Sequence, residues 1–275
     1  MTEQEKSVGF RRITIIGTGL MGCSLAALIR ERGVAGEVIG VDCSATSLEM
    51  ARRLGCVNGI MDDPARGVIG ADAVVLALPL DQIFVTLKKI GPDLKPGVML
   101  TCTAGTPFRL WEQASEAIPE ARALVPAFPL LFSSAHGPAA SGGAVLDQKT
   151  CLISRHPRFP QASCEKVRTF WEQVGLKTLA LSSAEFESMV SGLHLWPVLL
   201  GKLIREVGAA HDLIDKGGLL NQWLDLVAQR DEMERCFQLY AQPLERLLGD
   251  LGTKISSLQR QLGGGSGDRA EGDAG

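Results

Sequence analysis

Three glycines near the start of the chain, Gly17, Gly19 and Gly22, have the spacing G-x-G-x-x-G. An apolar run at residues 13–16 precedes them, and a second apolar run follows. In this arrangement the first glycine permits a tight turn, and the second lets the backbone approach a pyrophosphate. The third lets a helix pack close to its strand, and the N–H groups at the start of that helix face the phosphates. The pattern predicts a strand, a turn and a helix that bind a dinucleotide.

A carboxylate ends the next apolar run. Asp42 follows residues 37–41, at about the position where dinucleotide folds place the acid that binds the adenine ribose hydroxyls. A carboxylate there repels a 2′-phosphate, and the neutral neighbours Cys43 and Ser44 offer nothing to hold one. These residues favour NAD over NADP. The alternative is that Asp42 only caps the helix that we expect from residue 44.

The elements that must position these residues alternate along the first two thirds of the chain. Near-continuous apolar strands between amphipathic helices indicate a parallel sheet covered on both faces. The expected strands are residues 13–16, 37–41, 73–79, 98–102, 122–125, 150–154 and 177–181. The expected helices between them are residues 20–32, 44–54, 81–90, 107–117 and 160–174.

The character of the sequence changes at Ser183, where long helical patterns begin. We expect helices at 183–208, 219–229 and 231–261, with a break at Gly217 and Gly218. The expected organisation is a flexible leader (1–10), a Rossmann-type dinucleotide-binding domain (11–182) and an all-α dimerisation and substrate domain (183–262). Residues 263–275 are rich in glycine and charge, have nothing to bury and are expected to be disordered.

Composition excludes several classes of function. The chain has 275 residues, of which 45% are hydrophobic, and a formal net charge of −3, so nucleic acid and anionic membranes are poor partners. No apolar run is long enough to span a bilayer, and the charged start lacks the core of a signal peptide. The 7 cysteines form no CxxC pair, which suits reduced thiols in a cytoplasm and no metal site. We expect a cytoplasmic protein that acts on a small molecule.

Dinucleotide folds bind their ligands outside the carboxyl ends of the strands, so the loops after residues 79, 102 and 125 are the expected edges of the site. The residues that we assign to cofactor binding come from the glycine turn, the end of the second strand and the first two of these loops. They are Gly17, Thr18, Gly19, Leu20, Met21, Gly22, Asp42, Leu78, Pro79 and Thr103.

The order of these segments resembles the prephenate/arogenate dehydrogenase family of tyrosine biosynthesis. The resemblance covers nearly all of residues 11–260 and rests on GTGLMGCSLA at 17–26, VIGVDCSATSLEMARRLG at 38–55, ADAVVLALPLDQI at 71–83 and LKPGVMLT at 94–101. Later matches are Gly137-Pro138, the helix entry at 184–195 and the stretch at 229–239. The resemblance implies NAD(P)-dependent oxidation of a small acid, a helical second domain and a homodimer with the substrate between the two domains.

The catalytic loops depart from the family pattern. A serine that the family carries after the strand ending at Thr101 falls on Gly105, and its catalytic histidine falls on Phe128. A late arginine that holds the substrate carboxylate falls near Leu224. A general base contributes about 10²–10⁴-fold to such a reaction, and phenylalanine cannot act as one. We therefore expect a divergent substrate or mechanism rather than turnover of prephenate itself.

A second resemblance concerns the same loops. Ala104-Gly105, followed by the prolines at 126 and 129, is similar to the pyrroline-5-carboxylate reductases, which reduce an imine without a catalytic histidine. Their loop has an asparagine where this chain has Ala127, and their helical tail differs. The similarity implies a possible chemistry and not membership of that family.

Three residues remain as candidate proton carriers. His136, eight residues after Phe128, could replace the lost histidine, or it is an exposed loop residue. His194 lies on the first long helix, where it either approaches the substrate or is a half-buried helix residue. Ser133 could hydrogen-bond a substrate, although serines in glycine-rich loops usually stabilise turns.

Three hypotheses of function stay open. The first is an NAD-dependent oxidoreductase of this family with a divergent substrate, for which a carboxylic acid is one candidate. The second is an imine or ketone reductase that lacks a histidine base. The third is a catalytically silent dimer that binds NAD without turnover.

Overall fold

The computed structural model describes residues 9–118, 124–131, 136–210 and 237–264. Within these residues eight strands form one sheet in the order β3-β2-β1-β4-β5-β6-β7-β8. The strands are β1 (Phe10–Ile16), β2 (Ala35–Val41), β3 (Gly59–Met61), β4 (Ala73–Leu76), β5 (Met99–Cys102), β6 (Leu124–Pro129), β7 (Thr150–Arg155) and β8 (Lys177–Ser182). The expected Rossmann-type α/β fold with a helical C-terminal region is confirmed.

Buried apolar side chains lie on both faces of the sheet, because successive residues of a strand point to opposite sides. In β4, Val74 and Leu76 belong to one core cluster, whereas Ala73 and Val75 belong to the other. The first cluster packs beneath α3 (Pro64–Val68), α4 (Leu80–Ile90), α5 (Phe108–Ala117) and α8 (Ser183–Val190). The second packs beneath α1 (Leu20–Glu31), α2 (Ala45–Arg53), α6 (Gly143–Leu146) and α7 (Gln161–Gln173).

The sheet is not parallel throughout. All neighbouring strands run parallel from β3 to β6, but β7 pairs antiparallel with β6, with Phe128 opposite Leu152. β8 then pairs parallel with β7. The expectation of a wholly parallel sheet was wrong at this one junction. β3 and α3 were not expected either, because both are too short to show a periodic pattern.

The expected leader is shorter than residues 1–10, since β1 begins at Phe10. Phe10 is buried, and its ring meets the edge of the Phe170 ring at a centroid distance of 6.0 Å. β1 therefore begins three residues before the expected start, where Phe10 packs on α7 and pairs with Ala35 of β2.

The helix expected at 183–208 is interrupted. α8 passes through a π-helical turn at residues 191–195 into α9 (Trp196–Ala210). Pro197 explains this, because proline has no N–H and its ring clashes with the carbonyl four residues earlier in a regular α-helix. The wider π-helical turn accommodates the proline, so the side chains after the turn point in a different direction around the helix axis than those before it.

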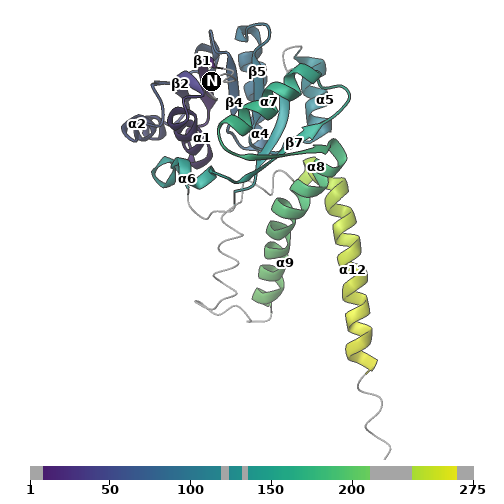
Figure 1. The fold of residues 1–275 in the computed structure, drawn as a ribbon. Helices are drawn as coiled ribbons and strands as arrows, with labels where there is room; N and C mark the ends of the chain where they lie inside the picture. Colours follow the sequence, from purple (N-terminus) through teal and green to yellow (C-terminus); the bar gives the residue numbers. More distant parts are fainter. Residues whose placement is uncertain (1–8, 119–123, 132–135, 211–236, 265–275) are drawn as a thin grey trace, which may run out of the picture.

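Among the described helices the two longest, α9 and α12 (Ala241–Gly264), extend away from the sheet, as Figure 1 shows. A short 3₁₀ turn, Phe237–Tyr240, leads directly into α12. Tyr240 of this turn is part of the core cluster beneath α8. Several expectations fall outside the described residues. They are the helix at 219–229 with Leu224, the first six residues of the helix at 231–261, and residues 265–275 of the tail.

Among the described residues, no helix has both the length and the apolar character needed to cross a membrane.

Candidate functional site

The glycine turn between β1 and α1 has the close packing that its sequence predicts. Gly17 has φ +101°, and a Cβ added to it would lie 2.2 Å from the carbonyl oxygen of Ala77. A Cβ on Gly22 would lie 1.8 Å from the carbonyl oxygen of Gly17. These two positions exclude any side chain because strand β4 and the turn itself occupy the space.

Gly19 differs from the other two glycines. A Cβ built on Gly19 meets no protein atom within 4 Å, so the space beside it is open. Gly19 is also the N-cap of α1, and no side chain caps this end in the described part of the chain. The first N–H groups of α1 therefore face open space, where the helix dipole favours an anion. This cradle fits the pyrophosphate of a dinucleotide.

Asp42 lies at the end of β2, beside the same turn. One of its carboxylate oxygens accepts hydrogen bonds from the Thr18 backbone N–H at 2.7 Å and from the Thr18 hydroxyl at 3.1 Å. The other oxygen accepts from the Ser44 N–H at 2.9 Å. The helix cap itself is Ser44, whose hydroxyl accepts from the Ser47 N–H. Asp42 therefore holds the turn, and its charge lies where a ribose would approach.

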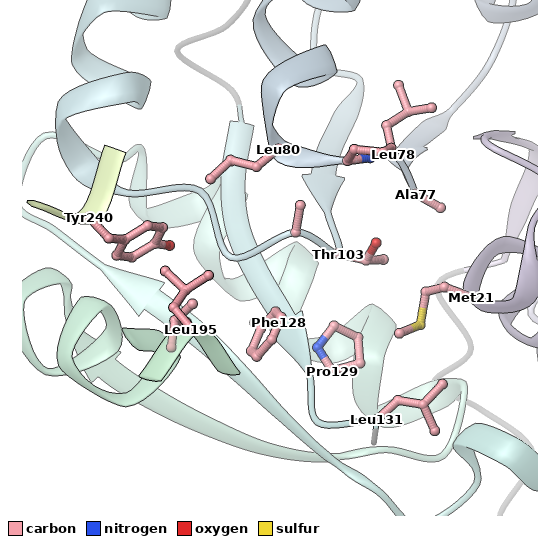
Figure 2. A pocket seen from close by; sticks show the side chains of 13 residues that line it. Met21, Ala77, Leu78, Leu80, Thr103, Phe128, Pro129, Leu131, Leu195 and Tyr240 are labelled. Atoms are coloured by element: carbon pink, nitrogen blue, oxygen red, sulfur yellow. The ribbon is translucent and has the colours of Figure 1, made fainter. Parts of the chain in front are cut away.

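A cavity of about 250 Å³ opens at the carboxyl ends of the central strands (Figure 2). Four of the residues assigned to the cofactor line it, namely Met21, Leu78, Pro79 and Thr103. The rest of the lining comes from the sheet and from the helical region: Ala77, Leu80, Ala104, Phe128, Pro129, Leu131, Val190, Leu195 and Tyr240. The structure thus brings the glycine turn, the loops after β4 and β5 and the helical region to one place.

The walls of this cavity are almost entirely apolar. Of the 13 described lining residues, only Thr103 and Tyr240 carry a polar side chain, and none carries a charge. Phe128, at the position where the family histidine falls, is 7% exposed and lines the cavity floor. Such a cavity can enclose an uncharged group at the end of a bound cofactor, and its described walls offer no cation to hold a carboxylate.

Gly105, at the position of the family serine, lies beneath Phe128 with φ +63°. Its N–H donates to the carbonyl of Ala127 at 3.2 Å, and its carbonyl accepts a hydrogen bond from the Tyr240 hydroxyl. Tyr240 is 1% exposed. The helical region is therefore fixed to the loop after β5 at the cavity wall.

Of the three candidate proton carriers, His136 and His194 lie within the described residues. His136 is exposed and is not among the residues that line the cavity. It lies just before residues 138–140, which pack on α1. His194 belongs to the π-helical turn, next to Leu195, which does line the cavity. Ser133 lies outside the described residues.

Sequence reasoning missed Tyr240, Val190 and Leu195 as residues of the site. Val190 precedes the π-helical turn and Leu195 ends it, so a proline that interrupts a helical pattern could have drawn attention to them. Tyr240 has no local signal, because the carbonyl that it contacts is 135 residues earlier in the chain.

No cluster of three or more histidine, cysteine, aspartate or glutamate side chains suitable for a metal ion occurs within the described ranges. The cysteines there are all free thiols, and four of them, Cys23, Cys56, Cys102 and Cys151, are buried.

Comparison with known proteins agrees with the geometry. Residues 25–180 match the family model of the prephenate dehydrogenase nucleotide-binding domain. A cyclohexadienyl dehydrogenase of Zymomonas mobilis is 26% identical over 197 residues, which are 71% of this chain and 67% of that protein. A prephenate dehydrogenase of Bacillus subtilis is 21% identical over 203 residues, which are 73% of this chain and 55% of that protein.

The fold extends the similarity beyond the matched domain. The crystal structure of a prephenate dehydrogenase from Aquifex aeolicus, in complex with hydroxyphenyl propionate and NAD⁺, superposes with a TM-score of 0.85 at 17% identity. The superposition covers 96% of this chain and 94% of that one, so it includes the helical region. Since the family model covers more than half of the sequence, the chain belongs to the prephenate dehydrogenase family.

Proposed function

We propose that this protein is an NAD-dependent oxidoreductase whose substrate or mechanism differs from that of prephenate dehydrogenases. The observation that carries the proposal is that the open space at Gly19 lies two residues from Met21, which lines the apolar cavity together with Leu78 and Thr103. A dinucleotide whose pyrophosphate lies at the start of α1 has its reactive ring at such a cavity in this class of fold. Bound NAD supplies the acceptor of a hydride, and NADH supplies the donor.

The residues of the chain account for binding and for the exclusion of water. Gly17 and Gly22 allow the close packing of the turn, Gly19 leaves room for the pyrophosphate, and the Asp42 carboxylate would accept hydrogen bonds from the ribose. The carboxylate of Asp42 disfavours a 2′-phosphate, which supports NAD over NADP. The apolar lining removes water from the reacting end, which strengthens the polar interactions made there.

The relatives act on prephenate or on cyclohexadienyl compounds, as their names state. The described walls of this cavity do not offer the charged partner that such a carboxylate normally requires. We therefore propose a small substrate that is less charged than prephenate at the end that enters the cavity. His136, His194 and Ser133 stay as proposals for a proton carrier, to be tested by alanine substitution.

An imine or ketone reductase is the second candidate. The observation in its favour is the absence of an acid–base residue other than Tyr240 among the described lining residues. A protonated imine carries its own proton to the reaction, so its reduction needs no general acid from the protein. This candidate predicts oxidation of NADH by a cyclic imine.

The decisive experiment measures binding of NAD, NADH, NADP and NADPH by calorimetry, followed by absorbance assays with prephenate, arogenate and a cyclic imine. Tight NAD binding with hydride transfer to or from any of these compounds supports the proposal. Tight binding without turnover favours a silent NAD-binding protein or a substrate of another class. If no dinucleotide binds, the proposal is wrong.

We also propose that the protein is a homodimer through its helical region. α9 and α12 expose apolar side chains on the part that extends from the sheet: Ile204 and Val207 on α9, and Leu248, Ile255 and Leu258 on α12. On α12 the apolar positions 244, 248, 251, 255 and 258 alternate by four and three residues, the spacing of a helix that packs along another helix. Exposed stripes of this kind are costly in water unless a partner covers them.

We propose a cytoplasmic location from the state of the cysteines. The six described cysteines are free thiols, which is the usual state in a reducing compartment.

A further inference from the structure

The hydroxyl of Thr103 differs from those of the other buried threonines. Five threonines are buried within the described residues. Four of them use the hydroxyl in a hydrogen bond to another part of the chain, namely Thr14, Thr18, Thr101 and Thr106. Thr103 is 7% exposed, and its hydroxyl makes no hydrogen bond to the described residues. A buried hydroxyl without a partner is unfavourable unless water or a ligand satisfies it.

Thr103 lines the apolar cavity at a fixed place. Its backbone N–H donates to the carbonyl of Leu76 at 3.0 Å, which holds the residue at the end of β4. Figure 2 shows its hydroxyl at the end of the cavity where Ala77 and Met21 lie, with Tyr240 at the opposite end. Met21 belongs to the first turn of α1. The hydroxyl therefore lies on the side of the cavity to which α1 contributes.

The chemistry of this hydroxyl complements the reactive end of a nicotinamide cofactor. The nicotinamide ring carries a carboxamide, which has an acceptor oxygen and an N–H₂ donor group. In an apolar cavity the carboxamide loses its hydrogen bonds to water, which is unfavourable unless the protein replaces them. Of the two polar side chains in the described lining, Tyr240 already donates its hydrogen to the Gly105 carbonyl. Thr103 has a hydrogen to donate and lone pairs that can accept.

We propose that the Thr103 hydroxyl is the hydrogen-bond partner of the cofactor's carboxamide and so orients the nicotinamide ring in the cavity. The inference rests on the proposed function and deepens it, because it assigns recognition of the reactive end of NAD to one side chain. Gly19 and Asp42 are assigned to the pyrophosphate and the adenine ribose, which many nucleotides share. Thr103 distinguishes a nicotinamide dinucleotide from a nucleotide that lacks this ring.

The test compares two probes by calorimetry with the full-length protein. One is NAD⁺, and the other is ADP-ribose, which has the same adenosine, pyrophosphate and second ribose but no nicotinamide. Each is titrated into the natural chain, Thr103→Val, which removes the hydroxyl at nearly constant volume, and Thr103→Ser, which keeps it. Thr106→Val is the matched control. Thr106 lies on the same loop and is 1% exposed, but its hydroxyl contacts the Cys102 thiol and it does not line the cavity.

Thr103→Val is expected to bind NAD⁺ about five- to tenfold more weakly than the natural chain, the usual effect of one lost hydrogen bond. Its affinity for ADP-ribose should stay within about twofold of that of the natural chain, because that probe has no carboxamide. Thr103→Ser should recover most of the NAD⁺ affinity, because it restores the hydroxyl. Thr106→Val should bind both probes as the natural chain does.

The inference is overturned if Thr103→Val binds NAD⁺ as tightly as the natural chain. It is also overturned if this variant loses affinity for NAD⁺ and ADP-ribose equally, or if Thr106→Val loses as much NAD⁺ affinity, because either result shows a structural effect of the loop. The natural chain alone tests the proposed function. If it binds neither probe, that function is wrong and the inference falls with it, whereas NAD⁺ binding that does not depend on Thr103 overturns the inference and leaves the function standing.

Discussion

The ring of Phe128 packs directly over Gly105: a Cβ built on Gly105 would lie 3.2 Å from Cδ2 of Phe128 and 3.1 Å from both Cγ atoms of Val190. Gly105 and Phe128, two of the three positions at which we expect this chain to depart from the family pattern, are therefore in contact. A side chain at 105 and a phenylalanine ring at 128 compete for the same space, so the two departures support one another.

This contact predicts that Gly105→Ala lowers the free energy of unfolding by roughly 2 kcal/mol. The cost has two parts, the strain of a positive φ at alanine and the crowding of the added methyl group by Phe128 and Val190. Gly97→Ala is the matched control, since Gly97 has φ +75° with no atom within 4 Å of an added Cβ. It should cost about 1 kcal/mol, from the backbone alone. Equal losses in urea unfolding of the two variants would show that Phe128 and Val190 do not crowd Gly105.

Gly19→Ala should separate binding from stability. Gly19 has φ −74° and open space beside it, so the substitution should change the free energy of unfolding by less than about 0.5 kcal/mol. The added methyl group occupies the approach of the pyrophosphate, so NAD affinity should fall at least about tenfold. Gly249→Ala on α12, far from the turn, should leave NAD affinity unchanged in the same calorimetry. If Gly19→Ala binds NAD as tightly as the natural chain, the pyrophosphate does not bind beside Gly19.

Asp72 gives the fold a pH dependence. A hydrogen bond from Lys95, with further ones from the Arg12 and Arg11 backbone N–H groups, lowers the pKa of Asp72 to about 2. Because the folded pKa lies below the unfolded value, this stabilisation is present above about pH 4 and is lost as the pH falls toward 2. Asp72→Asn should lower the free energy of unfolding by about 1–2 kcal/mol at pH 7. Unfolding curves measured at successively lower pH should show the difference in unfolding free energy between Asp72→Asn and the natural chain shrinking. A difference that stays constant would contradict the low pKa of Asp72.

Cys23 and Cys56 are buried thiols of the same core cluster; Cys23 donates to the carbonyl oxygen of Thr18, and Cys56 Sγ lies 3.9 Å from Ser141 Oγ. The interaction between the two thiols lowers the pKa of Cys56 and raises that of Cys23. Cys23→Ala should raise the pKa of Cys56 and so slow its alkylation by iodoacetamide at neutral pH, since the thiolate is the reactive form. Peptide mass spectrometry gives the labelling rate at each pH, and the exposed Cys43 in the same sample controls for the reagent. An unchanged pH profile for Cys56 would show that the pair does not interact in solution.

The apolar stripe of α12 predicts the assembly state. Ile255→Glu and Leu258→Glu, alone or combined, should convert a dimer to a monomer in sedimentation experiments, because each places a charge in the covered stripe. Lys254→Glu is the control, since residue 254 is exposed and outside the stripe. A natural chain that sediments as a monomer would contradict the proposed dimer.

The Rossmann part of the fold could be predicted from the sequence because its signals are local. The turn at Gly17, Gly19 and Gly22 is specified by residues within one strand and one helix, and the apolar runs around it are long. The cavity residues Leu78, Pro79 and Thr103 followed from one rule, that ligands bind beyond the carboxyl ends of parallel strands.

The antiparallel strand β7 could not be predicted in the same way. Its sequence is as apolar as that of a parallel strand, and its direction depends on pairing with β6, with Phe128 opposite Leu152. The contact between Tyr240 and Gly105 is similarly invisible, because neither residue has a neighbour in sequence that reports the other. Properties of the site that depend on long-range contacts had to come from the structure.

The hydrogen bond from Tyr240 to Gly105 also has a consequence for the order in which the site forms. A ribosome releases the glycine turn and all strands of the sheet well before residue 240, so the dinucleotide cradle can fold while the cavity still lacks one wall. The wall that carries Tyr240 is synthesised after every strand of the sheet. The turn at Gly17, Gly19 and Gly22 is therefore complete before the cavity beside it is closed.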